Sequence, residues 1–561
     1  MSKEDKKETK YLYGAAVQGI QNFIFQTNKL KEIVGASELV EQICTTAFDD
    51  YGGKVEEGKS VLRAAGNIKH IFDAKEDCEK TVFEFPRKVM TMAPGITISQ
   101  AVVSMPMKTK EGNLVSDYET ISNELEQRLR TQRNKAVRSM TLGLMAISRT
   151  PSTGLPAVDE VKRKYSDSKE IIDAGSKEKL DTVDKKEKRE KEKNFDKSNV
   201  YKDLMDTIAN RYVYHNEIAY DLEKLEGDNS WLAVIHADGN GMGMIVQEVC
   251  KNADYATEFS RLIDEISKES AHEAYKNVEE ECQKKKKLFL NDGVIPLRPV
   301  VLGGDDLTLI CRADLAVDFT RFYMENFEKF SKDKFNSSER IWKDDLGIKD
   351  VVKNGLTVCA GISFIKSSYP FHYAVKLAES LCKRAKKAAK KIDSELAPSC
   401  LMFHKVQDSF VEDFNEIAKR ELTPQLNLSF ECGPYYCGKR AEQYADGTLI
   451  PKGEKAESEN CKRTIEQLLQ EVSCLDVKES NAIKSHFRQW LSLLFDNVDA
   501  ANQKMKRLRA INVQAKNMIA ECFENLSENE EKKIPYHDIL SLTSILTQET
   551  KKGGNKHEQN N

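Results

Sequence analysis

The chain lacks several features that would place it in a familiar class. No apolar run is long enough to cross a bilayer and no signal peptide is visible, so we expect a soluble cytoplasmic protein with no membrane partner. Its 13 cysteines include no Cys-x-x-Cys pair, which is typical of reduced, buried thiols. The 86 Lys and Arg residues nearly balance the 90 Asp and Glu residues, so no overall positive field indicates nucleic-acid binding.

Common catalytic signatures are also missing. No Walker-type Gly-x-x-x-x-Gly-Lys-Ser/Thr loop occurs, which excludes a P-loop ATPase. Neither a nucleophile elbow nor a Cys–His pairing stands out. At 561 residues the chain is long enough for three or four domains, each with its own core.

What the chain does contain is a conspicuous turn between two apolar, strand-like runs, within residues 300–310. The turn is Gly303-Gly304-Asp305-Asp306. Its glycines leave room for a ligand against the backbone because they carry no Cβ. Its adjacent carboxylates offer two hard oxygen donors for Mg²⁺ or Mn²⁺. The same residue types also suit a plain β-turn, so a purely structural role stays open on the motif alone.

A second stretch strengthens the functional interpretation. Residues 231–237 form an apolar run that ends in Asp238 and a glycine-rich turn, which predicts a buried strand followed by a helix from about Gly243. If this strand lies beside the hairpin in one sheet, three carboxylates meet. Such crowding is resolved by divalent cations, and a pair of them suits in-line displacement at phosphorus. The pattern therefore predicts a nucleotidyltransferase or cyclase.

These two motifs resemble the palm domain of the large polymerase-cyclase subunit of type III CRISPR effector complexes. The segments Ala360-Gly361-Ile362-Ser363-Phe364 and Tyr369-Pro370-Phe371, and the helix of residues 378–386, follow in the order of that family. The resemblance extends to the N-terminal residues 18–25. Gly-Gly-Asp-Asp alone would also fit a diguanylate cyclase, so the order of all segments decides.

The resemblance implies an α/β (α+β) fold with two ferredoxin-like palm or nucleotide-cyclase domains and a C-terminal helical bundle. The second palm would join nucleoside triphosphates, with ATP as the expected substrate and two Mg²⁺ or Mn²⁺ ions as cofactors. Its acidic site would contain Asp238 and Asp305 as principal metal ligands and Asp306 as a third ligand or orienting group. Nucleotide contacts would come from Gly239, Asn240, Gly303, Gly304 and the phosphate-gripping Lys386. Asn240 departs from the family, which often has an acidic residue there.

In that family the product is a cyclic oligoadenylate messenger, made when guide RNA pairs with target RNA; some members join AMP to another small molecule instead. The implied partners are the other effector subunits, including a small helical subunit that meets the C-terminal domain, with guide and target RNA reached mainly through the complex. Relatives often begin with a His-Asp nuclease domain, which we expect to be absent because the palm-like segment starts at Gln18. The His537-Asp538 pair lacks partner histidines and is interpreted as coincidence. No cysteine lies between Cys78 and Cys250, so the zinc site of relatives is expected to be missing.

The predicted first palm repeats the order strand, helix, hairpin, helix, strand, helix. We expect a strand over residues 11–19, one helix over 20–31, and Gln18 at the place of Asp238. Ala65-Gly66-Asn67 would stand in for Gly303-Gly304-Asp305, leaving this copy without metal-binding carboxylates. The predicted divisions are a disordered leader (1–10), a degenerate first palm (11–150), a charged inter-palm region (151–221), a catalytic second palm (222–400), a connecting segment (401–457), a helical domain (458–550) and a flexible tail (551–561).

A basic stretch closes the second palm, in residues 383–391. Charge at a helix C-terminus explains it as well as a phosphate clamp does, and we assign its lysines and arginine other than Lys386 to solvent. Two further interpretations of the whole chain remain. One is a stand-alone nucleotide cyclase outside any CRISPR complex. The other is a non-catalytic scaffold subunit, which predicts that Asp305 and Asp306 lie far from Asp238.

Overall fold

The structure is a computed structural model. It describes residues 9–53, 60–64, 66–108, 114–115, 117–135, 146–162, 169–192, 195, 203–226, 230–338, 352–407, 413–425, 427–449, 463–475, 481–511, 526 and 532–546. The predicted tail and residues 1–8 of the predicted leader lie outside this part, whereas Lys10 already begins the first strand. Within the described part, no helix has the length and apolar character needed to span a membrane.

Two sheets share one strand order. The first runs β2-β3-β1-β4, and the second begins β10-β11-β9-β12, so in both the first strand of the unit lies between its third and fourth. All of these pairs are antiparallel. This is the ferredoxin-like order, and it confirms the predicted α/β class. The strands are β1 (Lys10–Gln18), β2 (Ser60–Ala64), β3 (Asn67–Phe72), β4 (Thr97–Met105), β9 (Leu232–Gly239), β10 (Leu297–Gly303), β11 (Asp306–Arg312) and β12 (Val358–Ile365).

The second sheet continues beyond these four strands. β13 (Ser399–Lys405) pairs in parallel with β12, and β15 (Tyr435–Cys437) pairs antiparallel with β13. The predicted boundary at residue 400 therefore falls inside β13, and the predicted connecting segment supplies the edge strand. That segment also contains α14 (Phe414–Glu421), β14 (Leu428–Ser429) and α15 (Lys439–Ala445).

The first sheet and its helices are called the first palm below. The helices are α1 (Ile20–Ile24), α2 (Leu30–Cys44), α3 (Thr46–Gly52), α4 (Lys75–Met92) and α5 (Tyr118–Arg133). The prediction of one helix over residues 20–31 is wrong, because the chain leaves the helix between α1 and α2. There the Asn28 side chain accepts a hydrogen bond from the backbone N–H of Phe371, 2.9 Å away, at the start of α13.

The second palm consists of the second sheet with α9 (Met242–Val249), α10 (Ala253–Lys284), α11 (Ala316–Ser337) and α13 (Phe371–Ile392). Alternate strand residues point to opposite faces of the sheet. One face shares a hydrophobic core with α10 and α11. On the other face α13 packs so closely on β12 that a Cβ at Gly361 would lie 2.0 Å from the carbonyl oxygen of Ala378.

The first palm covers the rest of this α13 face. Residues of α2 share a core with Val234, Val300 and Ile310 of the second sheet. The Ser37 hydroxyl donates to the carbonyl oxygen of Val300. Next to it, the buried carboxylate of Glu38 lies 3.6 Å from Arg298. The two palms are therefore joined through a buried interface.

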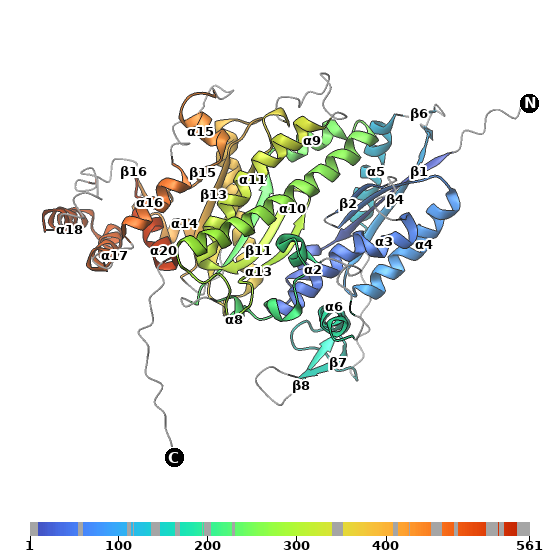
Figure 1. Cartoon of the computed structure of the whole chain (residues 1–561), viewed down its shortest axis with the longest axis horizontal. Helices are drawn as coiled ribbons and strands as arrows, with labels where there is room; N and C mark the ends of the chain where they lie inside the picture. Colours follow the sequence, from blue (N-terminus) through green and yellow to red (C-terminus); the bar gives the residue numbers. More distant parts are fainter. Residues whose placement is uncertain are drawn as a thin grey trace, which may run out of the picture.

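The remaining elements lie outside the two palms. Between β4 and α5 lie β5 (Met107–Lys108) and β6 (Leu114–Val115). The inter-palm region contains β7 (Ala157–Lys162), β8 (Lys169–Asp173), α6 (Ala174–Glu190) and α7 (Leu204–Ala209), and α8 (Leu222–Leu225) precedes β9. The C-terminal region contains α16 (Ile465–Leu475), α17 (Asn481–Asp496), α18 (Val498–Ile511), β16 (Lys532–Lys533) and α20 (Tyr536–Leu546). Figure 1 shows the first palm and the C-terminal helices at opposite ends of the molecule, with the second palm between them. The second palm therefore contacts both.

The contact between α13 and β12 leads to a stability prediction. Gly361→Ala should lower the free energy of unfolding by about 1–3 kcal/mol, because the new methyl group has no space against the Ala378 carbonyl. Gly243→Ala in α9 is the matched control, since no atom lies within 4 Å of its Cβ position and alanine favours a helix. Urea unfolding followed by circular dichroism compares the two. Equal stability of both variants would contradict the close packing.

Candidate active site

Strand β9 presents the first candidate residue, Asp238, near its end. Val234 of this strand belongs to the core shared with the first palm. His236 and Asp238 follow it at the two-residue spacing of a strand face. Both side chains therefore belong to the face that α13 and the first palm cover.

The hairpin between β10 and β11 carries the other two carboxylates. Gly303 pairs with Asp306 across the hairpin, so Gly304 and Asp305 form a two-residue turn. Gly304 has a φ of +63°, a left-handed conformation that glycine adopts without steric cost. The Ser267 hydroxyl of α10 donates to the Gly304 carbonyl and fixes the turn.

The register between β11 and β9 brings the two strand ends together. Thr308 pairs with His236, and their side chains meet at 3.1 Å between Oγ1 and Nδ1. Asp306 lies two residues before Thr308, on the same face, and so faces Asp238. Ligand atoms of His236, Asp238 and Asp306 all lie within 4.8 Å of one another.

Asp305 joins this group beside Gly239, since its Oδ2 lies 3.1 Å from the position of a Cβ there, and after burial the charge of Asp238 is among the causes that raise its pKa. All three predicted carboxylates are therefore close together. The scaffold interpretation required them to be far apart, and the structure contradicts that separation.

Burial and crowding disfavour charge on these groups. Burial, and next the charge of Asp238, raise the pKa of Asp305 to about 6. Burial, and then Asp305 and Asp238, raise the pKa of Asp306 to about 7. Burial lowers the pKa of His236 to about 4, which keeps its imidazole neutral. Half-buried carboxylates with a neutral imidazole fit a divalent cation, because a cation offsets their mutual repulsion and carboxylate oxygens suit Mg²⁺ and Mn²⁺.

Gly239 allows the strand end and the turn to approach each other. A Cβ at this position would lie 2.9 Å from the Cβ of Asp305 and 2.8 Å from the Cγ of Met242. Distances this short force a shift of the backbone or of Asp305. Glycine at this position therefore keeps Asp305 next to Asp238.

Lys386 of α13 reaches the same strand end. Its ammonium lies 2.5 Å from Asp238 Oδ2 and donates to the carbonyl oxygen of Gly239 at 2.7 Å. The predicted site residue Lys386 is thus part of the group. It supplies positive charge on the side of Asp238 where α13 lies.

Asn240 is buried beside the end of β12. Its amide nitrogen donates to Thr357 Oγ1 at 3.0 Å and to the carbonyl oxygen of Pro398 at 3.4 Å. Its backbone N–H donates to the carbonyl oxygen of Thr357. These contacts anchor the turn that follows β9.

A cavity of about 220 Å³ lies between the two palms, next to these groups. The second palm contributes His236, Gly303, Asp306 and Thr308, and α1 and α2 of the first palm supply the opposite wall. Gln21 of α1 donates a hydrogen bond to Glu379 of α13, and both residues line the cavity. A ligand in this cavity would therefore touch both palms.

The sequence-based list of site residues missed His236, Gln21 and Glu379. His236 was recoverable, because it lies two residues before Asp238 and so shares its strand face. Gln21 and Glu379 are brought together only by the packing of the palms. They are 358 residues apart in the chain, and no local pattern marks their contact.

Residues 231–394 match the family model described as Cas10/Cmr2, second palm domain. This part of the chain is similar to the second palm domain of Cas10/Cmr2 proteins. This match confirms the resemblance drawn from the sequence for the part of the chain that holds the three carboxylates. A search of curated proteins gave no match.

Solved structures similar to the whole chain include Csm1 from T. onnurineus, with 11% identity and a TM-score of 0.46, covering 98% of this chain and 71% of that chain. A Csm1-Csm4 cassette in complex with cA4 has 11% identity and a TM-score of 0.43, covering 96% and 70%. The same cassette with AMPPNP has 10% identity and a TM-score of 0.44, with the same coverage. Because these identities and TM-scores are low, the similarity to Cas10/Cmr2 proteins depends on the match of residues 231–394.

The strand registers relate the first palm to the Cas10/Cmr2 palm residue by residue. The hairpin-closing pair is Ala64–Asn67 in the first palm and Gly303–Asp306 in the second. Asn67 therefore corresponds to Asp306. The next residue of the hairpin pairs with Ala15 of β1 in the first palm and with Ala237 of β9 in the second. Ala15 therefore corresponds to Ala237.

By the same count Ala16 corresponds to Asp238, Gln18 to Asn240 and Gly66 to Asp305. The predicted equivalences of Gln18 with Asp238 and of Asn67 with Asp305 are therefore wrong, because the strand registers shift Gln18 by two positions and Asn67 by one. The sequence comparison aligned Gly66 with Gly304, but the glycine of the first hairpin is the second residue of its turn and Gly304 is the first. Ala65 lies outside the described residues.

The corrected positions still hold no carboxylate in the first palm. Gly19 and Gly241 support the correction, because both precede a helix and have φ values of +66° and +72°. Carboxylates at these positions thus occur in the second palm and not in the first, and the first palm contributes the facing wall of the cavity.

The acidic group leads to a metal-binding prediction. Mn²⁺ should raise the midpoint of thermal unfolding of the wild-type chain, because a ligand that binds only the folded state stabilises it. Asp306→Asn should abolish most of this increase by removing one negative ligand. Without metal, the variant should be as stable as wild type or more so, since repulsion among buried carboxylates falls.

Asp292→Asn is the matched control for this thermal-shift measurement. Asp292 is exposed and has a φ of +47°, which asparagine also tolerates. Its variant should respond to Mn²⁺ like wild type. An equal Mn²⁺ response in Asp306→Asn would show that the ion binds elsewhere.

Proposed function

We propose that the second palm is a metal-dependent nucleotidyltransferase that joins nucleoside triphosphates, with ATP as its substrate. The chain would act as the cyclase subunit of a type III CRISPR effector. It would make a cyclic oligoadenylate, or an AMP conjugate of another small molecule, when guide RNA pairs with target RNA. The observation that carries this proposal is the meeting of Asp238, Asp305 and Asp306 beside a cavity in a Cas10/Cmr2 palm.

The proposed reaction is a displacement at the α-phosphorus of a triphosphate. The oxygen of a hydroxyl group forms the new P–O bond and loses its proton, while the bond from the α-phosphorus to pyrophosphate breaks. Bound Mg²⁺ or Mn²⁺ would lower the pKa of that hydroxyl and offset the charge of the phosphates. Positioning of the substrates would depend on side chains and backbone of the two palms.

Asp238, Asp305 and Asp306 are the proposed catalytic and metal-binding residues. The distances favour Asp238 and Asp306 as direct ligands, with His236 within reach of the same ion. Asp305 lies beside Gly239 and Asp238 and would orient Asp238 or complete a second ion site. The sequence analysis instead took Asp305 as a principal metal ligand and Asp306 as a third ligand or orienting group.

The proposed nucleotide contacts surround this acidic group. Gly303 lines the cavity and leaves space for a base or sugar, while Gly304 shapes the turn. Gly239 and the anchored Asn240 hold the end of β9. Lys386 would contact phosphate, and its ion pair with Asp238, the proposed metal ligand, supports this role.

The first palm would shape the acceptor side of the reaction. Its helices α1 and α2 form the wall opposite Asp306, and Gln21 bridges to Glu379 of the second palm. A nucleotide held on the acidic side would place its neighbour against this wall. The first palm has no carboxylate at the positions that correspond to Asp238, Asp305 and Asp306. Glu41 of α2 does line this wall, and burial raises the pKa of its carboxyl, which disfavours negative charge near the phosphates.

The proposal predicts product formation that depends on the acidic turn. The purified chain, alone and in any RNA-bound complex it forms, would be incubated with labelled ATP and Mn²⁺, and products would be resolved by mass. We expect phosphodiester-linked products and pyrophosphate from wild type. Asp305→Ala/Asp306→Ala should lower the rate at least about 10³-fold, since one transition-state-stabilising group alone contributes about 10²–10³-fold.

Two comparisons make the assay decisive. Asp292→Asn should retain full activity, and Lys386→Ala should retain metal binding but react more slowly. Activity without any bound RNA would favour a stand-alone cyclase. No product from an intact, RNA-activated complex would contradict the enzyme proposal and favour the scaffold.

A further inference from the structure

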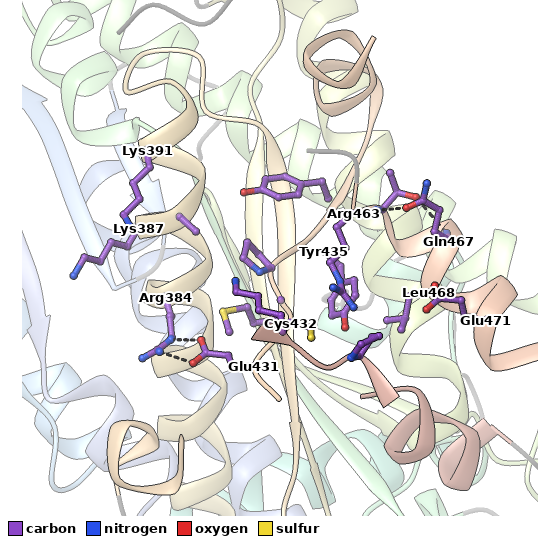
Figure 2. Close-up of a pocket in the computed structure, with 18 residues that line it drawn as sticks. Arg384, Lys387, Lys391, Glu431, Cys432, Tyr435, Arg463, Gln467, Leu468 and Glu471 are labelled. Atoms are coloured by element: carbon purple, nitrogen blue, oxygen red, sulfur yellow. Dashed lines mark hydrogen bonds and ion pairs between the residues drawn. The ribbon is translucent and has the colours of Figure 1, made fainter. Parts of the chain in front are cut away.

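A second, larger cavity lies where the second palm meets the C-terminal region. This cleft has a volume of about 710 Å³ and lies between α13, β15 and α16. Figure 2 shows α13, with Arg384, Lys387 and Lys391, on one side and α16, with Gln467, Leu468 and Glu471, on the other. None of its lining residues lines the cavity between the palms. The cleft is therefore a separate site.

Positive charge dominates the walls of the cleft. Two carboxylates, Glu431 and Glu471, face five cations, which leaves an excess of three positive charges. The cations are Arg384, Lys387 and Lys391 of α13, Arg463 before α16, and Lys533 before α20.

Most of this charge is not paired with a carboxylate among the described residues. Arg384 is satisfied, because its guanidinium donates two hydrogen bonds of 2.5 Å to Glu431. Lys387, Lys391 and Lys533 make no ion pair with any described residue. Uncompensated cations on facing walls of one concavity favour an anionic ligand.

Arg463 offers a further donor inside the cleft. Its guanidinium carbon lies 5.2 Å from the centre of the Tyr435 ring, and its Nε is buried with no hydrogen-bond partner among the described residues. The hydroxyl of Tyr435 donates to Asp538 at 2.6 Å, which fixes the ring below the guanidinium. A buried N–H without a partner is costly, and an acceptor atom of a ligand would satisfy it.

The floor of the cleft is partly apolar. Met402, Pro434, Leu468 and Pro535 line it between the charged walls. A cavity of this volume, with an apolar surface and a few charged groups, has the dimensions of a small-molecule site. The combination fits a ligand with a flat, weakly polar part and several negative charges.

We propose that this cleft binds a nucleoside polyphosphate at a site separate from the acidic group of the second palm. Lys387, Lys391 and Lys533 contact its phosphates, Arg463 donates to the phosphate or sugar, and the base lies on the apolar floor. A single RNA strand fits less well, because such sites stack bases on exposed aromatic rings. Here Tyr435 and Tyr436 are buried, at 1% and 2% exposure.

The test measures binding by titration calorimetry to the full-length Asp305→Ala/Asp306→Ala chain in EDTA, so that metal-dependent binding at the acidic site is removed. The probes are ATP, inorganic tripolyphosphate and a short single-stranded RNA. Lys387→Gln/Lys533→Gln removes one cation from each wall and should weaken ATP and tripolyphosphate binding about tenfold or more.

The matched control is Lys390→Gln/Lys506→Gln, which removes two exposed lysines, one in α13 and one in α18, that do not line the cleft. This control should bind ATP like its parent. Equal weakening in both double variants, or no ATP binding at all, would overturn the proposal. Tight RNA binding without ATP or tripolyphosphate binding would also overturn it and assign the cleft to a nucleic-acid strand.

Discussion

The arrangement of the acidic site depends on the burial of one face of the second sheet by two different partners. The helix α13 covers β12 and β13, and the first palm covers β10 and β11 through α2. Where α13 and the first palm meet, at the end of β9, the side chains of Asp305 and Asp306 are half-buried. Carboxylates placed there lose hydration, which explains why burial is the largest cause of the raised pKa values of Asp305 and Asp306.

The two palms divide the requirements of such a site between them. The second palm holds the carboxylates on rigid strand ends, where the register fixes their distances. The first palm has the same strand order but carries Ala16, Gly66 and Asn67 at the corresponding positions. It provides the facing wall, so the duplicated fold places the group of three aspartates on one side of a cavity and α1 and α2 on the other.

Features that depend on the local sequence pattern could be predicted from the sequence. The apolar run ending in Asp238 and the glycine turn with Asp305 and Asp306 predicted two adjacent strands, and the structure brings their carboxylates together. The local pattern could not fix register in the first palm, because a glycine can occupy either residue of a two-residue turn. The single helix predicted over residues 20–31 failed for a similar reason. Asn28 contacts the start of α13, 343 residues away, and nothing local indicates that contact.

The basic residues of α13 lie close together in the sequence but have different surroundings in the structure. Its basic run was assigned to solvent apart from Lys386, and that assignment is wrong for Arg384, whereas Lys387 and Lys391 are exposed as predicted. Lys386 contacts Asp238, Arg384 is paired with Glu431, and Lys387 and Lys391 line the cleft beside α16. Because 3.6 residues complete a turn, neighbouring lysines of one run point in different directions. Their partners come from distant segments, so the charge run becomes informative only once the sheet, the first palm and the C-terminal helices surround this helix.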